Sequence, residues 1–329
     1  MAEKLLDPRM TTPSNLKNSV FQNSPLRLRE APALVLLLVI IAWMFLFKST
    51  FRSLENIGQI GQQAGILGIM ACGEALVILT GGVDLSVGAI AAMAACVAGG
   101  RMSAGMPWQL AVICGLGAGL AGGWINGALI TYRKLPPILT TLATLLGFRA
   151  FTNIITGAVP YTPLSAGFGK IASSYGPIVS FVLVVVVLAT VLARVRFGRR
   201  IVAIGCNEQA VRLSGISTDA VIRRVYLLSG LLAGAAGILI SGASNSAQWN
   251  IADGYELNAI AAVVIGGVRL SGGEGSIIGA ALGAIILVTM QKSLFLYGRP
   301  QEQYGLVIGA VILLAAFAEQ FRRFRESKN

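Results

Sequence analysis

The sequence predicts an all-α integral membrane protein of about ten transmembrane helices, some short or broken, with both termini in the cytoplasm. Three observations predict this class. Of the 329 residues 55% are hydrophobic and 12% are charged, against roughly 25% charged in soluble domains. The mean hydropathy is +0.75. Apolar runs recur from residue 31 to residue 318 and leave little chain for a soluble domain.

Each predicted span rests on one apolar run. The first run is followed by Lys48–Arg52 instead of a small-residue cleavage site, so we interpret it as a retained helix, not a signal peptide. The eighth and tenth runs are shorter than the roughly 17 residues of a simple span. We expect them to be tilted, broken or extended, and the count is open between eight and eleven. The runs are 31–47, 57–80, 84–100, 108–131, 136–157, 177–193, 225–242, 258–268, 276–296 and 305–318.

The basic residues predict the orientation. Residues 1–30 and 319–329 are expected to be basic cytoplasmic tails, the first of them flexible, on either side of a transmembrane domain over 31–318. With ten spans, 19 of the 26 Lys and Arg residues fall on the cytoplasmic side, seven of them in the loop 194–224. The net charge of +12 therefore reflects the orientation of the chain in the membrane, and we expect no nucleic-acid partner.

Several functions are excluded by what the sequence lacks. The chain has no histidine, which removes histidine-ligated zinc and histidine acid–base chemistry. The four cysteines have neither disulfide nor metal spacing. No phosphate-binding loop is present, so we expect no ATP hydrolysis by this chain, no bound cofactor and no catalytic residue. A membrane enzyme acting on lipid is disfavoured because no coherent catalytic group exists.

The loop 194–224 contains a predicted short helix. Asn207 suits an N-cap, Glu208 suits the positive end of the helix dipole, and Gly215 suits a left-handed C-terminal cap. A helix of about two turns is marginal alone in water. It therefore packs under the bundle or binds a partner, and we leave both interpretations open.

Glycines recur in two patterns. Thr80–Gly88 and Gly266–Gly275 share Gly-Gly-Val-x-Leu-Ser, which predicts either irregular backbone lining a wet cavity or two ordinary turns at the cytoplasmic surface. Glycines spaced by four along a helix let helix backbones approach closely. This packing is predicted for Gly115, Gly119, Gly123, Gly127, Gly275, Gly279 and Gly283.

Polar side chains inside spans are the third kind of signal. Ionisable groups in a membrane usually face the bundle interior or a water path. A polar translocation path and hydrogen bonding between helices both explain such residues. The candidates are Glu74, Asp84, Ser86, Asn126, Thr140 and Thr141.

Together, these motifs resemble the membrane permease subunits of bacterial ATP-binding-cassette (ABC) sugar importers of the ribose, xylose, arabinose and galactose type. The resemblance spans roughly residues 31–318. It rests on the blocks Ile78–Gly88, Pro136–Leu142, Gly205–Ala210, Ser214–Ile216, Ile260–Gly267 and Leu270–Ser276, in that order.

The resemblance implies a multi-pass protein of the bacterial inner membrane. Its implied partners are a second permease subunit (the same chain or a close paralogue), ATPase subunits that use ATP and Mg at the cytoplasmic face, a periplasmic sugar-binding protein and membrane lipid. It also implies that Gly205–Ile216 is the helix that couples to the ATPase, through Gly205, Asn207, Glu208, Ala210, Ser214 and Gly215. A secondary carrier or channel, and a branched-chain amino-acid permease, are the alternatives.

Overall fold

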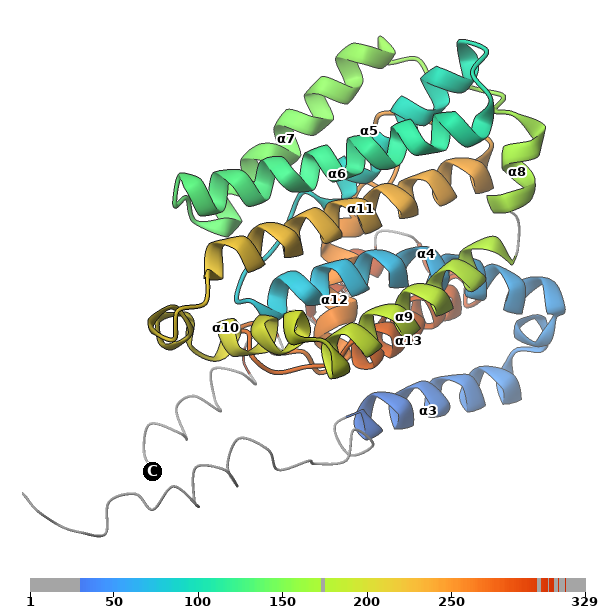
Figure 1. Ribbon diagram of the computed structural model, residues 1–329. Coiled ribbons are helices and arrows are strands. Elements are labelled where there is room, and N and C mark those ends of the chain that lie inside the picture. The colour runs from blue at the N-terminus through green and yellow to red at the C-terminus, as the bar shows by residue number, and fades with distance from the viewer. Residues whose placement is uncertain are drawn as a thin grey trace, which may run out of the picture.

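The computed structural model describes residues 30–172, 175–300, 303–306, 308–310, 313 and 317, and they form a bundle of helices (Figure 1). Within these residues the only β-type pairing is a single bridge between Tyr161 and Ala247. Except for Glu30, the predicted tails 1–30 and 319–329 lie outside the described residues.

Nine described helices are apolar. Six are long enough to cross a membrane: α4 Leu54–Leu79, α6 Trp108–Tyr132, α7 Pro137–Thr156, α9 Gly176–Arg194, α11 Thr218–Ser244 and α13 Ile277–Leu296. Three are shorter: α3 Ala31–Phe47, α5 Val87–Ser103 and α12 Tyr255–Ile265. An all-α membrane protein is thus confirmed. The tenth predicted span, 305–318, lies largely outside the described residues, so the count of ten stays a prediction, as does the orientation.

The helices pack in layers around α11. Figure 1 shows α5, α6 and α7 on one side of α11, and α4, α9 and α13 on the other, with α3 at the edge. The helices α4, α5 and α11 supply the largest shares of the buried core, together with α13. In α5 the buried residues are mainly alanine and glycine, and such small side chains let neighbouring backbones approach closely. The outward faces of α7 and α9 carry exposed Leu, Ile and Val, as expected of lipid-facing surfaces.

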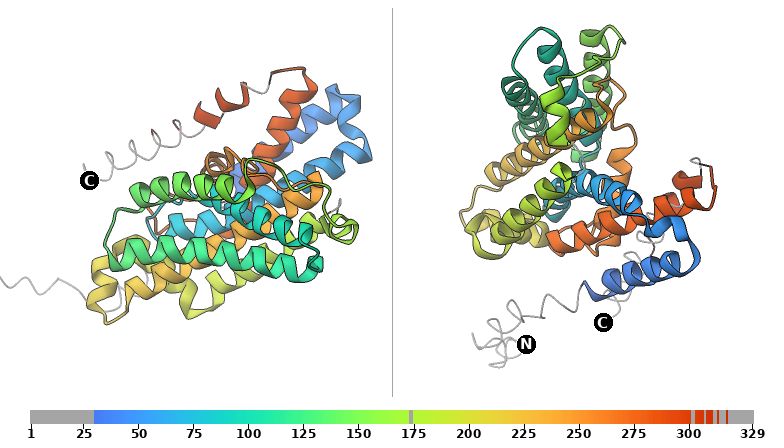
Figure 2. Two further views of the ribbon diagram at one scale, coloured as in Figure 1. Left: turned by 90° about the horizontal axis from the view of Figure 1, so that it is seen from above. Right: turned by 90° about the vertical axis from the view of Figure 1, so that its right-hand side faces the viewer.

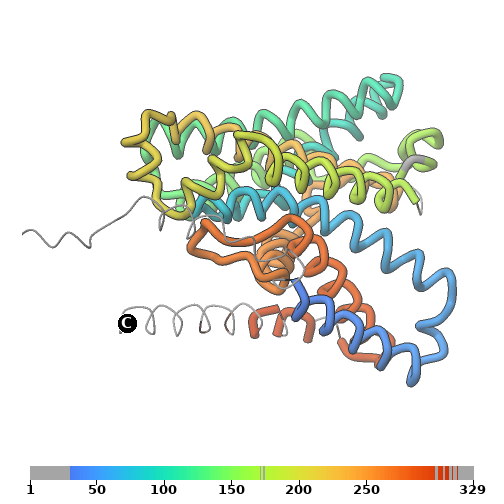
Figure 3. The backbone as a smooth tube through the Cα atoms, turned by 60° about the horizontal axis from the view of Figure 1, so that its bottom comes forward, coloured from blue at the N-terminus to red at the C-terminus, as the bar shows by residue number. Residues whose placement is uncertain are grey.

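The connections gather at two ends of the bundle. Loops 80–86, 133–136, 195–217 and 266–276 share one end, which we call the coupling end (Figure 3). The backbone N–H of Gly273 donates to the carbonyl oxygen of Leu79 there, at 3.1 Å. At the opposite end Tyr161 pairs with Ala247. Figure 2 shows the same bundle in two further views.

Glycine packing joins α6 to α11. A Cβ atom on Gly119 would lie 2.7 Å from the carbonyl oxygen of Gly230, and one on Gly123 would lie 3.0 Å from Gly230 Cα. Cβ atoms on Gly115 and Gly127 would likewise meet neighbouring backbone, so the predicted packing face of α6 is confirmed. Gly279 and Gly283 pack the same way against α12.

The predicted helical face is wrong for Gly275. The side chain of Ser276 accepts a hydrogen bond from the backbone N–H of Gly279, so Ser276 is the N-cap and α13 begins after Gly275. Gly275 has φ +149° and packs against Val268 in the preceding loop.

Two other predicted boundaries are corrected, and one helix was not predicted. The helix expected over 84–100 begins at Val87, because the Asp84 carboxylate binds the backbone N–H of Ser86 and holds residues 84–86 in a turn. The span expected over 258–268 is α12, Tyr255–Ile265, which ends at the Gly266–Gly267 turn. A short helix that was not predicted, α8 Ala166–Ala172, lies in the loop 158–176.

Candidate coupling site

The predicted two-turn helix forms the second half of α10, Arg196–Leu213. The backbone breaks at Asn207, which has φ −164° and ψ 95°. Asn207 Oδ1 accepts a hydrogen bond from the backbone N–H of Ala210 at 2.9 Å, which is the expected N-cap. The first half of α10, 196–206, is a helix that was not predicted.

The same helix ends as its sequence predicts. Gly215 has φ +80°, and its N–H donates to the carbonyl oxygen of Arg212, while the N–H of Ile216 donates to that of Val211. This pair of hydrogen bonds is a Schellman motif, which requires a left-handed residue at Gly215. The Ser214 hydroxyl caps the carbonyl oxygen of Ala210 at 2.9 Å.

Next to the break at Asn207, α10 contacts the two glycine-containing loops 80–86 and 266–276. A Cβ atom on Gly205 would overlap the carbonyl oxygen of Leu79 and the backbone nitrogen of Gly273. One on Gly272 would lie 2.8 Å from the nitrogen of Gly81 and 3.1 Å from Gly205 Cα. We call these five residues (Leu79, Gly81, Gly205, Gly272 and Gly273) the glycine junction. It joins α10 backbone-to-backbone to the end of α4 and to the loop before α13.

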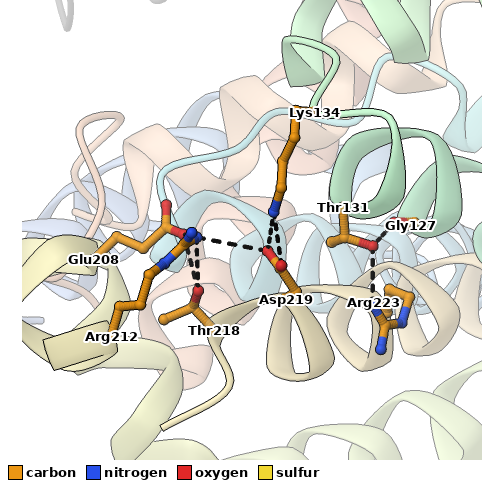
Figure 4. Close-up of polar contacts among 8 residues, drawn as sticks. All are labelled: Gly127, Thr131, Lys134, Glu208, Arg212, Thr218, Asp219 and Arg223. Carbon is orange, nitrogen blue, oxygen red and sulfur yellow. Dashed lines mark hydrogen bonds and ion pairs between the residues drawn. The ribbon is translucent and has the colours of Figure 1, made fainter. Parts of the chain in front are cut away.

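A polar network ties the same helix to α6 and α11 (Figure 4). Arg212 Nη2 lies 2.7 Å from Glu208 Oε1 and 3.6 Å from Asp219 Oδ1. Lys134 Nζ, from the loop between α6 and α7, lies 2.6 Å from Asp219 Oδ2. The Thr218 hydroxyl donates to Glu208 Oε1 at 3.0 Å. These side chains are at least one third exposed except Thr218, so each ion pair adds at most about 1 kcal/mol to stability. The network positions the helix more than it stabilises the fold.

A cavity of about 400 Å³ lies between these parts. Its walls come from the loop after α4, the Pro136–Pro137 pair, the second half of α10 and the start of α11. The structure thus brings three distant sequence motifs together at the coupling end. Residues that line the cavity include Gly81, Gly82, Pro136, Pro137, Glu208, Arg212, Asp219 and Tyr226.

The predicted path residues form a separate, buried cluster. Glu74 Oε1 accepts the backbone N–H of Asp84 at 3.0 Å. Asp84 Oδ1 accepts the Ser86 hydroxyl at 2.6 Å, and Asn126 Nδ2 donates to Ser86 Oγ at 2.7 Å. All four side chains are fully buried. The cluster therefore joins α4, the turn before α5, and α6.

The threonines extend the cluster to α7. The Thr144 hydroxyl donates to Asn126 Oδ1 at 2.7 Å, and the Thr141 hydroxyl lies 3.1 Å from the carbonyl oxygen of Val83. The Thr140 hydroxyl donates to the carbonyl oxygen of Pro136 within its own helix. None of the six predicted path residues lines either cavity described for the structure. Apart from Thr140, their side chains join neighbouring elements of the bundle, which is the alternative use given above, and a role in solute passage stays a prediction.

Replacing Asp84 tests how much this cluster contributes to the free energy of unfolding. Asp84→Ala leaves the Ser86 N–H and hydroxyl without their acceptor inside the bundle, and we expect a loss of about 3 kcal/mol or more, because each buried unsatisfied group costs about 1–3 kcal/mol. Asp84→Asn keeps an acceptor oxygen and is expected to stay within about 1 kcal/mol of the parent protein. Thermal unfolding in detergent measures both. Equal stability of the alanine variant and the parent would contradict the view that Asp84 stabilises the fold as a buried hydrogen-bond acceptor.

Some residues of the site were not predicted. Tyr226 and Ser229 of α11 are buried in the interior of the bundle. Among the described residues, the hydroxyl oxygens of both side chains have no hydrogen-bond partner. From the sequence, Lys134 and Arg212 count only as basic residues of cytoplasmic loops, and Asp219 was not predicted. No spacing rule links them, because the partners lie up to 85 residues apart.

Comparison with known proteins gives a consistent picture. Residues 56–316 match the family model described as the branched-chain amino acid transport system / permease component. The ribose import permease protein of Bacillus subtilis is 40% identical over 86% of this chain and 90% of its own length. The ribose import permease protein of Escherichia coli K12 is 37% identical over 88% and 92%. The galactose/methyl galactoside import permease protein of the same strain is 33% identical over 91% and 96%. No solved structure matches the chain.

Proposed function

The chain belongs to the family of branched-chain amino acid transport system permease components, and we propose that it is the membrane-spanning subunit of an ABC importer for a monosaccharide. The observation that carries the proposal is the match over nearly the whole chain to proteins named import permeases for ribose and galactose. A fructose import permease protein of Rhizobium meliloti is also 34% identical over 89% of the chain. These relatives favour a sugar over a branched-chain amino acid as the substrate.

The structure of the coupling end supports the proposal that a separate ATPase subunit supplies the energy for transport. The two-turn helix of α10 exposes Glu208 and Gln209, which leaves a surface for an ATPase subunit. The sequence holds no phosphate-binding loop of its own. We propose that the coupling end faces the cytoplasm, that ATP and Mg bind to the partner ATPase, and that this chain binds no cofactor and has no enzymatic activity.

The same geometry suggests how movement is transmitted. A displacement of α10 acts on the end of α4 and on the loop before α13 through the glycine junction. It acts on α6 and α11 through Lys134 and Asp219. Close backbone packing resists compression, so these helices shift as bodies between outward- and inward-open states. A periplasmic binding protein delivers the sugar, and a second permease subunit in the lipid bilayer completes the path.

Sugar uptake into proteoliposomes tests the function. We expect the chain, reconstituted with its ATPase and with a ribose-loaded binding protein, to accumulate labelled ribose only when ATP is present on the ATPase side. Reversing the charge of Glu208 (Glu208→Lys) breaks its bonds to Arg212 and Thr218, and we expect at least a tenfold lower rate. Glu55→Lys, a charge reversal at an exposed carboxylate in the first turn of α4, at the opposite end of that helix from the coupling end, is the control. Uptake without the ATPase, driven by an ion gradient, would show a secondary carrier instead.

A further inference from the structure

A second cavity, of about 720 Å³, lies between α4, α12 and α13, away from the coupling end. This volume is in the range of small-molecule sites, about 300–1,000 Å³. Its polar lining includes Gln63, Asp253, Asn258, Gln291 and Lys292, and a further wall comes from Tyr304, Gly305, Ile308 and Gly309. The coupling site uses none of these residues.

The position of α12 places this cavity at membrane depth. With 11 residues, α12 is about 16 Å long, roughly half of the 30 Å hydrocarbon core. It ends at the coupling end, where a Cβ atom on Gly266 would overlap the carbonyl of Gly279, the third residue of α13. Its first residue, Tyr255, therefore lies about halfway through the bundle.

The chain just before α12 is irregular at the same depth. The Arg149 Nη1 atom, in the interior of α7, donates to the carbonyl oxygens of Trp249 and Ile251, both at 2.9 Å. Residues 249–254 thus lie beside the middle of a membrane-spanning helix without forming a helix that spans. Irregular backbone at this depth is tolerated where it is buried in protein or lines a water-filled cavity. The cavity beside Asp253 and Gly254 meets that condition.

The polar side chains have spare hydrogen-bonding capacity toward the cavity. Gln63 is exposed, and its side-chain amide has no hydrogen bond within the described part of the chain. Gln291 Nε2 donates to Asn258 Oδ1 at 3.2 Å, and Lys292 Nζ donates to Gln59 Oε1 at 2.7 Å. Each of these amides keeps at least one further donor or acceptor. A lipid-facing surface does not favour such groups, whereas a wet, solute-filled space does.

The composition of the cavity fits a sugar. Amide donors and acceptors suit hydroxyl groups, and the rings of Tyr255 and Phe295, which also line or flank the cavity, offer flat apolar surfaces. We propose that this cavity is the transient binding site of the transported monosaccharide within the membrane, an inference that rests on the proposed function. The affinity is low, because a solute must leave the site as readily as it enters.

Filling the cavity tests the proposal. Gln63→Trp places a large ring in the cavity, and Gln109→Trp, at an exposed glutamine near the start of α6, is the matched control. In the reconstituted complex with labelled ribose, the measured quantity is sugar moved per ATP hydrolysed. We expect it to fall at least tenfold for Gln63→Trp and to equal the parent value for Gln109→Trp. Equal ratios for both variants would overturn the site.

A labelling experiment keeps the test independent of large side chains. In Gln63→Cys, a water-soluble thiol reagent is expected to modify position 63, and millimolar ribose is expected to slow the reaction at least twofold. No reaction would place this face against lipid, out of reach of water, and overturn the site. If the parent complex itself moves no ribose, the proposed function fails, not the location of the cavity.

Discussion

Replacing Gly205 with valine is expected to abolish ATP-driven uptake while leaving the chain in the membrane. A Cβ atom at this position would overlap the backbone of Leu79 and Gly273, and neither can move aside as a flexible side chain would. The added methyl groups force α10 away from the glycine junction. Because α10 is joined to α4 there, movement of the helix would no longer reach the membrane helices.

Uptake and ATP hydrolysis in proteoliposomes measure the effect. We expect at least a hundredfold lower sugar uptake for Gly205→Val, with the amount of protein in the membrane near that of the parent. Gly58→Val is the matched control, since Gly58 is also helical and a Cβ atom there has nothing within 4 Å. Parent-level uptake by Gly205→Val would show that the glycine junction does not transmit the movement.

The second large effect is expected on stability. Gly123→Leu inserts a side chain where a Cβ atom alone would overlap the carbonyl oxygen of Tyr226 and lie 3.0 Å from Gly230 Cα. Overpacking costs about 1–3 kcal/mol in a core whose side chains can adjust. Here the obstacle is the backbone of α11, the central helix of the bundle, so we expect about 3 kcal/mol or more.

Unfolding in detergent, followed by size-exclusion chromatography of the surviving fraction, checks this expectation. Gly117→Leu is the control, because Gly117 lies on the exposed face of the same helix and has open space beside it. We expect this variant to stay within about 0.5 kcal/mol of the parent. If Gly123→Leu unfolds at the same temperature as Gly117→Leu, α6 and α11 are not held by close glycine packing.

Features that depend on local chemistry could be predicted from the sequence. The cap at Asn207, the left-handed Gly215 and the glycine face of α6 each follow from residue types a few positions apart, and each is confirmed. The apolar runs likewise located the membrane helices within a few residues, apart from the ends of α5, α11 and α12.

Features that depend on tertiary contact could not be predicted. The meeting of Gly81, Gly205 and Gly272 joins residues up to 191 positions apart, and only the fold brings them together. Gly275 seemed to continue a helix face by spacing, but the cap at Ser276 overrides the periodicity. Buried polar residues such as Asn126 cannot be assigned to a path or to helix packing from spacing, because both uses put a polar group inside the bundle.

Affinity purification from native membranes in mild detergent tests the central claim, that this permease is driven by a separate ATPase bound at Asn207–Gly215. Mass spectrometry of the purified complex is expected to show a stoichiometric ATPase subunit with the parent chain. With Gly215→Val, which strains the left-handed C-cap, we expect the ATPase to be lost while the permease remains folded. A stable permease that carries no ATPase, under conditions that preserve a control ABC complex, would contradict the account.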